Sequence, residues 1–207
     1  NQSSYSIGAI ALDPSNPHVV WVGTGENVGG RHVGYGDGIY RSVDGGASWE
    51  KRGLEASEHI SKIIVHPSDS DTIFVAAQGP LWSAGGERGF YKTTDGGETW
   101  TKTLGDDEYN GVTDILIDPR DPDTLYAATW QHHRNVAALM DGGPETGIHK
   151  STDGGETWTE LSKGLPEGNM GKIGLALSPQ NPDVIYAAIE LDRRKGGVWR
   201  STDRGAS

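Results

Sequence analysis

A ten-residue motif recurs along this chain and constrains the fold more than any other feature. It reads YRSVDGGASW from Tyr40, YKTTDGGETW from Tyr91 and HKSTDGGETW from His149, and a shorter copy, WRSTDRGAS, begins at Trp199. Its aspartates are Asp44, Asp95, Asp153 and Asp203. They are separated by 51, 58 and 50 residues. A repeat of this length predicts an array or a β-propeller rather than a two-layer domain.

The complete repeat unit contains four short runs rich in Val, Ile, Tyr and Trp, separated by Pro, Gly, Asn and Asp. Such runs predict short antiparallel strands joined by tight turns. The first run is nearly all apolar and predicts the innermost strand, whereas the fourth is charged and predicts an exposed outer edge. We therefore expect an all-β fold, a β-propeller arc of four-stranded antiparallel blades. The expected blades cover residues 5–53, 58–105, 110–164 and 170–207.

The Asp-Gly-Gly turn itself is interpreted as structural. Its glycines can adopt the positive φ angles of a tight turn, and the Asp carboxylate can accept hydrogen bonds from nearby backbone N–H groups. The Trp that follows can fill volume between blades. A carboxylate tied into its own turn, once per blade, is badly placed to converge with others on one substrate. The structural set is Asp44, Trp49, Asp95, Trp100, Asp153, Trp158 and Asp203.

Composition excludes several classes of function. The chain has 18 basic and 29 acidic residues, a net charge of -11, and no basic stripe interleaved with aromatic residues. A nucleic-acid partner and insertion into a membrane are therefore not expected. No cysteine is present, which removes disulfides and thiolate chemistry. We expect no cofactor. We also expect no metal site, because the adjacent His132 and His133 point to opposite sides of an extended chain.

The motif Ser/Thr-x-Asp-x-Gly-x-x-Trp is the Asp-box, or BNR repeat, and SVDGGASW, TTDGGETW and STDGGETW match it at every defining position. The chain resembles sortilin/VPS10-like propellers, whose bacterial members are often labelled glycosyl hydrolases and which share their blades with sialidases and xyloglucanase-type enzymes. The likeness to the sortilin-like proteins also rests on three further segments, WVGTGE, AAQGPLW and DGGPETGIHKSTDGG. The resemblance implies a structural Asp-box away from the binding face, and a secreted or periplasmic location.

The last Asp-box departs from the pattern, because it stops at STDRGAS before its expected Trp. We therefore expect residues 1–207 to form a single Asp-box segment of a larger propeller, an open arc whose fourth blade is incomplete. The remaining blades of that propeller are the expected neighbours. The Arg-Ile-Pro stretch that precedes the first box in many sialidases is absent, which disfavours sialidase chemistry.

Function is expected at the rim opposite the Asp-box turns, where the variable loops lie. As binding residues the sequence offers Arg31, His32, Tyr35, Lys62, Trp82, Arg88, Trp130, His132, His133 and Arg134. Lys62 and Asp114 are polar positions of otherwise apolar inner strands, so they are expected to face the central channel. Contact with water in the channel is a sufficient explanation for the polarity of Lys62 and Asp114. Trp82 can likewise serve only to anchor its own loop. The segment AALMDGG predicts a short helical turn on this rim.

Two functional classes remain open from the sequence. The favoured one is a non-catalytic binding module that presents its loops to a peptide, protein or glycan, as the sortilin likeness implies. The alternative is part of a glycoside hydrolase, which needs one protonated and one ionised carboxyl group about 5 to 9.5 Å apart. The candidate catalytic residues are Glu26, Asp37, Asp114 and Asp141. No pair among them is singled out by spacing.

Overall fold

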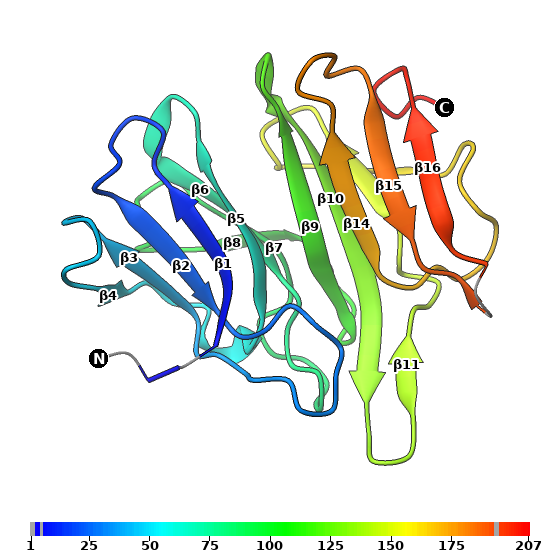
Figure 1. Cartoon of the computed structure of the whole chain (residues 1–207), viewed down its shortest axis with the longest axis horizontal. Coiled ribbons are helices and arrows are strands. Elements are labelled where there is room, and N and C mark those ends of the chain that lie inside the picture. Colours follow the sequence, from blue (N-terminus) through cyan, green and yellow to red (C-terminus); the bar gives the residue numbers. More distant parts are fainter. Residues whose placement is uncertain (1–2, 5, 193–194) are drawn as a thin grey trace.

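Four antiparallel sheets follow one another along the chain and stand side by side as the blades of an arc (Figure 1). The computed structural model describes residues 3–4, 6–192 and 195–207. Residue 5, the expected start of the first blade, lies outside the described residues. Strands pair in chain order within each blade, so the first strand is innermost. The predicted all-β propeller architecture is confirmed.

The first two blades have four strands each. The first contains β1 (Ile7–Leu12), β2 (Val20–Thr24), β3 (Ile39–Ser42) and β4 (Glu50–Lys51). The second contains β5 (Ile60–His66), β6 (Asp69–Ala77), β7 (Gly89–Thr93) and β8 (Thr101–Leu104). A 3₁₀ turn, η1 (Glu55–Ser57), connects them.

The last two blades depart from this plan. The third contains β9 (Asn110–Asp118), β10 (Asp121–Arg134), β12 (Ile148–Ser151) and β13 (Thr159–Leu161), and the extra strand β11 (Leu139–Asp141) pairs with the end of β10. The fourth contains β14 (Ile173–Leu177), β15 (Ile185–Ile189) and β16 (Gly197–Ser201). The described residues thus form no outer strand on this blade, in agreement with an incomplete fourth blade.

The predicted helical turn at AALMDGG is wrong. Residues 139–141 instead form β11, which pairs with His132–Arg134 in a hairpin that projects beyond the sheet (Figure 1). Asn135 closes this hairpin, because its N–H donates to the Ala138 carbonyl oxygen at 2.9 Å and its side-chain oxygen accepts the Ala138 N–H at 2.7 Å. Tertiary pairing with the end of β10 thus decides the conformation over local helix preference.

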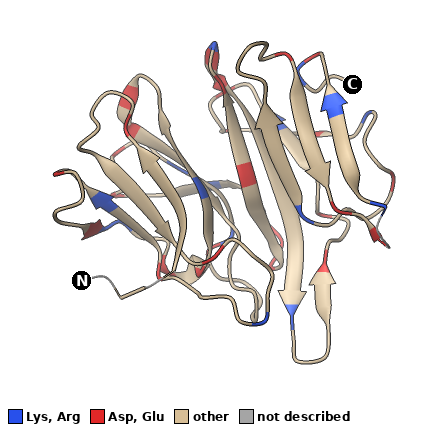
Figure 2. Ribbon diagram, viewed as in Figure 1, with Lys and Arg blue, Asp and Glu red and all other residues tan. Residues whose placement is uncertain are grey.

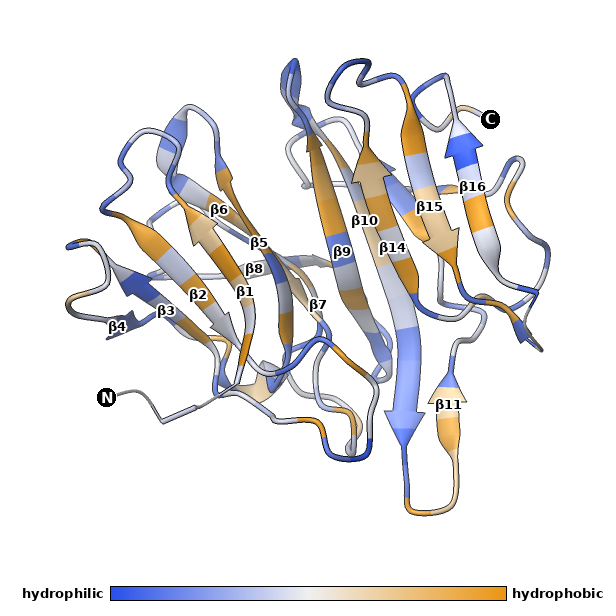
Figure 3. Ribbon diagram, in the orientation of Figure 1, coloured by the Kyte–Doolittle hydropathy of each residue, from blue (hydrophilic) through white to orange (hydrophobic). Residues whose placement is uncertain are grey.

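Apolar and polar residues alternate along many of the strands (Figure 3), and three clusters of buried apolar side chains each join two neighbouring blades. The inner strands contact each other in the order β1, β5, β9, β14. Strands β5 and β9 are covered on both faces, as their apolar sequences predict. The end blades are covered on one face only, and side chains such as Ile10 and Val198 are 68% and 72% exposed there.

Each Asp-box turn is closed by its aspartate. The Asp44 carboxylate accepts the Ser48 N–H at 2.8 Å and the hydroxyls of Ser48 and Ser42 at 2.6 and 2.8 Å. The other three turns repeat these bonds. The Ser48 hydroxyl bond is the main cause that lowers the pKa of Asp44 to about 2. The box carboxylates are therefore occupied by their own turns.

Each box Trp of the second and third blades packs on the preceding blade. Trp100 Nε1 donates to the Arg52 carbonyl oxygen at 2.6 Å, and Trp158 Nε1 donates to the Thr103 hydroxyl at 3.1 Å. The Trp158 ring also meets the edge of Phe90, with ring centroids 4.8 Å apart. The Trp side chains thus couple each outer strand to the blade before it.

Two buried hydroxyl groups join the inner strands at bulges in β5 and β9. Ser61 donates to the carbonyl oxygens of Ala76 and Val112, both at 3.1 Å. Thr113 donates to the carbonyl oxygen of Ile173 at 2.9 Å and lies 3.3 Å from that of Ala128. Each hydroxyl therefore links its own blade to the next one.

Charged residues of both signs are interspersed over strands and loops rather than gathered by sign (Figure 2). In the described part of the chain, no helix is long and apolar enough to cross a lipid bilayer.

Candidate functional site

A polar pocket opens at the loop end of the inner strands, on the rim opposite the Asp-box turns. It is lined by Asn27, Ser61, Lys62, Thr113, Asp114, Lys172, Ile173 and Gly174, and encloses about 620 Å³ that is partly open to solvent. The first strands of three blades supply most of this lining, and a loop of the first blade supplies Asn27. All four blades therefore contribute to one site.

Lys62 and Asp114 form an ion pair in the lining of this pocket. The Lys62 Nζ atom lies 3.4 Å from Asp114 Oδ1. The other carboxylate oxygen accepts the backbone N–H of Leu175 at 2.9 Å, so Asp114 links the third blade to the fourth. Because Lys62 is 44% exposed, its ammonium group retains donors that can reach a ligand.

Lys172 enters the same pocket from the start of the fourth blade. Its ammonium group donates to the side-chain and backbone oxygens of Asn27 at 2.6 and 3.1 Å, and lies 5.0 Å from the centroid of the Trp130 ring. Burial lowers the pKa of Lys172, and the nearby carboxylates of Asp141 and Asp114 oppose this shift. Lys172 is thus held by neutral acceptors and an aromatic face.

The loop between β2 and β3, residues 25–38, crosses the rim to reach the other blades. Besides its contact with Lys172, the Asn27 side-chain oxygen accepts from Gln78 of the second blade. Arg134 of the third blade donates to the Gly29 carbonyl oxygen at 3.0 Å. One loop of the first blade therefore contacts all three others; we call residues 25–38 the cross-rim loop.

Trp130 and His132 are packed beneath this rim. Their rings stack with centroids 4.0 Å apart and an angle of 9° between planes, and each residue is 1% exposed. Burial lowers the pKa of His132 to about 3, so this imidazole is neutral at physiological pH. The indole Nε1 donates to Asp141 at 3.0 Å. His133 lies on the other side of the strand against Tyr109.

The candidate carboxylates are dispersed. Glu26 accepts the Gly34 N–H at 2.9 Å within the cross-rim loop. Asp37 accepts the hydroxyl of Ser3 and that of Tyr40, the latter at 2.7 Å, and lies 3.4 Å from Lys51 Nζ. These contacts, the Ser3 hydroxyl first, outweigh the effect of burial and lower the pKa of Asp37. Of the four candidates, only Asp114 lines the pocket.

Glu190 is a further carboxylate that the sequence did not single out. Partial loss of hydration and then the charge of Asp141 raise its pKa. Gly171 lies between the two residues, since a Cβ atom there would stand 3.1 Å from both the Asp141 carbonyl oxygen and Glu190 Cβ. Asp141 and Glu190 are therefore neighbours at the edge of the site.

The remaining predicted binding residues differ in exposure. Arg31, His32 and Tyr35 are exposed on the cross-rim loop, and Trp82 is 42% exposed on the loop between β6 and β7. Arg88 is 1% exposed, and its guanidinium donates to three carbonyl oxygens of its own loop. Burial lowers its pKa to about 10. Arg88 thus shapes that loop.

Sequence reasoning also missed Asn27 and Lys172. When the four opening runs are aligned so that Lys62 and Asp114 coincide, Lys172 stands where the other units have Ile7, Ile60 and Val112. That charged residue at an apolar repeat position was the available signal. Asn27 carries no comparable signal, because its loop differs from blade to blade. Among the described residues, no three His, Asp or Glu side chains gather as metal ligands.

Comparison with known proteins agrees with this architecture. The chain is 32% identical over 130 residues to the xyloglucanase Xgh74A of Acetivibrio thermocellus, a match that covers 58% of this chain and 14% of that protein. The solved GH74 xyloglucanase of Xanthomonas campestris superposes with a TM-score of 0.69 at 19% identity, over 95% of this chain and 28% of that one. The GH74 enzyme of Niastella koreensis gives 0.66 at 22% identity, over 97% of this chain and 29% of its own.

This chain therefore spans only a small part of the length of these relatives. Residues 37–164, more than half of the chain, match the family model described as Sortilin, neurotensin receptor 3. This match includes three Asp-boxes and the whole third blade up to the end of its outer strand. The chain belongs to the Sortilin-Vps10 family of Asp-box β-propellers.

Proposed function

We propose that this propeller segment is a binding module that holds a polysaccharide of the xyloglucan type on its loop rim. The observation that carries the proposal is the pocket at the loop end of the inner strands, where Asn27, Lys62, Asp114 and Lys172 converge. The names of the curated relatives, which are xyloglucanases, support a glycan rather than a peptide or protein ligand.

The chemistry of the rim suits a neutral glycan. Sugar hydroxyl groups both donate and accept hydrogen bonds, and the pocket offers ammonium donors next to carboxylate and amide acceptors. Trp82 is 42% exposed and Tyr35 is 69% exposed, so both aromatic rings can stack on sugar rings. Trp82 is linked to the pocket region, because the neighbouring Leu81 accepts the Arg134 N–H at 2.8 Å and Arg134 contacts the cross-rim loop.

Binding is favoured over catalysis because the pocket carboxylate is already engaged. Asp114 faces Lys62 with one oxygen and accepts a backbone N–H from the next blade with the other. A general acid or base must be free to exchange a proton with substrate. The ligand would reside outside the cytoplasm, which fits the secreted or periplasmic location expected for this family.

Glycoside hydrolysis is a second candidate, favoured by Glu190 and Asp141. The raised pKa of Glu190 favours its protonated form, which a general acid requires. The neighbouring Asp141 accepts the Trp130 indole N–H. A glycosidase needs one protonated and one ionised carboxyl group in its site.

Titration calorimetry with a xyloglucan oligosaccharide tests the binding proposal. We expect Lys172→Met and Lys62→Met each to weaken binding by about tenfold, the loss of one charge-assisted hydrogen bond. Lys102→Met, a lysine of the outer strand β8, is the matched control and should bind like the wild type. If the oligosaccharide does not bind the folded wild-type chain, or the three variants bind alike, the proposal fails.

Hydrolysis of the same oligosaccharide separates the two candidates. A pure binding module releases no reducing ends, and Glu190→Gln leaves its affinity within about twofold of the wild-type value. Turnover that disappears in both Glu190→Gln and Asp141→Asn would instead establish the hydrolase.

A further inference from the structure

One contact joins the first blade directly to the fourth, between Asn27 of the cross-rim loop and Lys172 at the start of the fourth blade. Lys172 Nζ lies 2.6 Å from Asn27 Oδ1 and 3.1 Å from the backbone carbonyl oxygen of the same residue. An amine held against an amide in this way has lost most of the entropy that a reaction between them would cost. The pair is therefore placed for chemistry as well as for hydrogen bonding.

The side-chain amide of Asn27 is polarised by a second donor. Its oxygen also accepts a hydrogen bond from Gln78 Nε2. Gln78 is buried, and its backbone N–H donates to the His59 carbonyl oxygen at 2.9 Å, so this donor is fixed in place. A fixed donor stabilises the negative charge that develops on a carbonyl oxygen when a nucleophile attacks its carbon. Gln78 thus activates Asn27 toward attack.

Lys172 has the surroundings of a reactive amine. Its ammonium group lies 5.0 Å from the centroid of the Trp130 ring, and burial lowers its pKa. A lowered pKa increases the share of neutral amine, which is the form that attacks a carbonyl carbon. The carboxylates of Asp141 and Asp114 oppose this shift. The amine therefore becomes more reactive as the pH rises.

Glu190 is placed to carry the proton that such an attack releases. Its backbone N–H donates to the Lys172 carbonyl oxygen at 3.1 Å, one step beyond the pairing of Ile173 with Ile189. Residues directly opposite each other in an antiparallel pair project their side chains on the same face of the sheet. Partial loss of hydration and then the charge of Asp141 raise the pKa of Glu190. Its carboxylate is therefore a stronger proton acceptor than an ordinary one.

We propose that Lys172 and Asn27 form an intramolecular isopeptide bond, which ties the fourth blade covalently to the first. The neutral amine of Lys172 attacks Cγ of Asn27 while Gln78 holds the amide oxygen. The Nζ–Cγ bond forms, the Cγ–Nδ2 bond breaks, and ammonia leaves. Glu190 accepts one proton from Nζ and passes it to Nδ2. Its carboxylate is thereby regenerated, and no group is oxidised or reduced.

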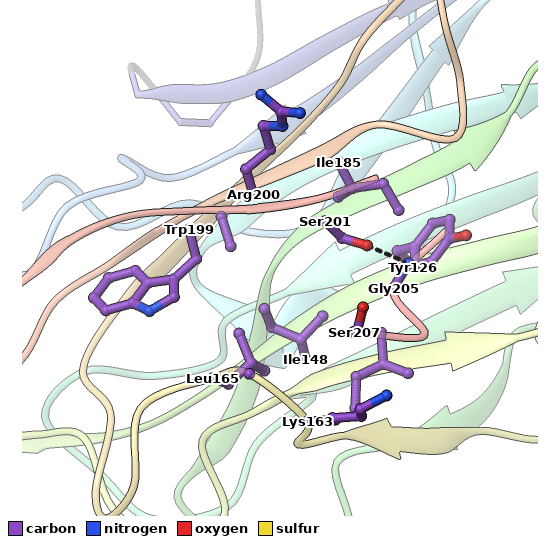
Figure 4. A pocket seen from close by; sticks show the side chains of 13 residues that line it. Tyr126, Ile148, Lys163, Leu165, Ile185, Trp199, Arg200, Ser201, Gly205 and Ser207 are labelled. Carbon is purple, nitrogen blue, oxygen red and sulfur yellow. Dashed lines mark hydrogen bonds between the residues drawn. The ribbon is translucent and has the colours of Figure 1, made fainter. Parts of the chain in front are cut away.

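This bond adds a covalent link to blades that otherwise meet through side-chain packing. Figure 4 shows side chains of the third and fourth blades, among them Tyr126, Ile148 and Trp199, around a space of about 500 Å³. The bond also removes the charge of Lys172 from the loop-rim pocket. It goes beyond the proposed function, because glycan binding and bond formation are alternative uses of Lys172. The binding measurements refer to the unreacted chain.

Intact-mass measurement tests the proposal. At pH 9 the wild-type chain should lose one ammonia, about 17 Da, at least about tenfold faster than at pH 7, because more of the Lys172 amine is neutral. Trypsin should then release residues 1–31 joined to residues 164–193, since an acylated lysine is not cleaved. Lys172→Met should lose no ammonia, and the control Lys102→Met should react like the wild type. Glu190→Gln should react at least about tenfold more slowly.

Two results overturn the proposal. An unchanged wild-type mass after incubation at pH 9 shows that the bond does not form. A loss of ammonia that persists in Lys172→Met, with residues 1–31 released alone, shows that an asparagine has instead closed a succinimide ring on its own backbone. The joined peptide is measured in the wild type, so the test holds even if Lys172→Met does not fold. Neither result depends on whether a glycan binds.

Discussion

Replacement of Thr113 by valine tests the hydroxyl link between the third and fourth blades. Valine keeps the shape of threonine but removes the group that donates to the Ile173 carbonyl oxygen at 2.9 Å and contacts the Ala128 carbonyl oxygen at 3.3 Å. Thr113 is only 4% exposed, so water cannot readily replace the lost donor. Loss of a buried partner of this kind costs about 1 to 3 kcal/mol.

We therefore expect Thr113→Val to lower the free energy of unfolding by about 2 kcal/mol. With a urea m-value of about 2 kcal/mol/M, the midpoint of unfolding should fall by about 1 M. Circular dichroism in the far and near ultraviolet measures this change and checks that both signals report one transition. Thr101→Val, on the exposed outer strand β8, is the control and should change stability by less than about 0.5 kcal/mol. If the two variants unfold at the same urea concentration, the hydroxyl link does not stabilise the arc.

Three further changes probe other parts of the fold. The folded-state pKa of His132, about 3, lies below its unfolded value, so its contribution to stability is complete above about pH 6.5 and is lost as pH falls toward 3. The free energy of unfolding of the wild type should therefore fall between pH 7 and pH 4.5, and in His132→Phe this fall should be smaller by roughly 2 kcal/mol. If the wild type and the variant lose the same free energy over this range, His132 is not buried as a neutral ring. Gly155→Ala should lower the free energy of unfolding, measured in urea, by about 1 to 3 kcal/mol, because Gly155 has a φ of +84° and an added Cβ would stand 2.8 Å from the Phe90 ring. The control Gly30→Ala should be near neutral, because an added Cβ there has no atom within 4 Å. Arg88→Met should accelerate amide hydrogen exchange in residues 81–85, because the Arg88 guanidinium binds the carbonyl oxygens of Pro80, Ser83 and Gly85 in this loop, and unchanged protection would refute that role.

The repeated turns made the blade architecture predictable. Each Asp-box fixes the boundary between a third and a fourth strand, and the alternation of apolar runs and turns places the other strands around it. The projecting hairpin was not predictable in the same way. Its residues favour a helix locally, and only pairing with the end of β10 makes them a strand.

The site was partly predictable for a related reason. Lys62 and Asp114 occupy the same position of successive inner strands, so their polarity predicted that both face the channel, and the structure brings them together as an ion pair in one pocket. Trp130 illustrates the limit, because its sequence context does not reveal that His132 covers its ring and leaves it 1% exposed. Contacts such as that of Asn27 with Lys172 join loops far apart in the sequence and follow no repeat.

The cross-rim loop joins the first blade directly to the fourth, across the open side of the arc. Blades joined only through their neighbours can change the overall curvature by small tilts at each interface, whereas a contact from the first blade to the fourth fixes the distance across the arc. Asn27 makes this contact by accepting from Lys172 of the fourth blade, and the same oxygen accepts from Gln78 of the second blade. A ligand that recruits the Lys172 ammonium group must compete with Asn27, so occupancy of the pocket and curvature of the arc are thermodynamically linked.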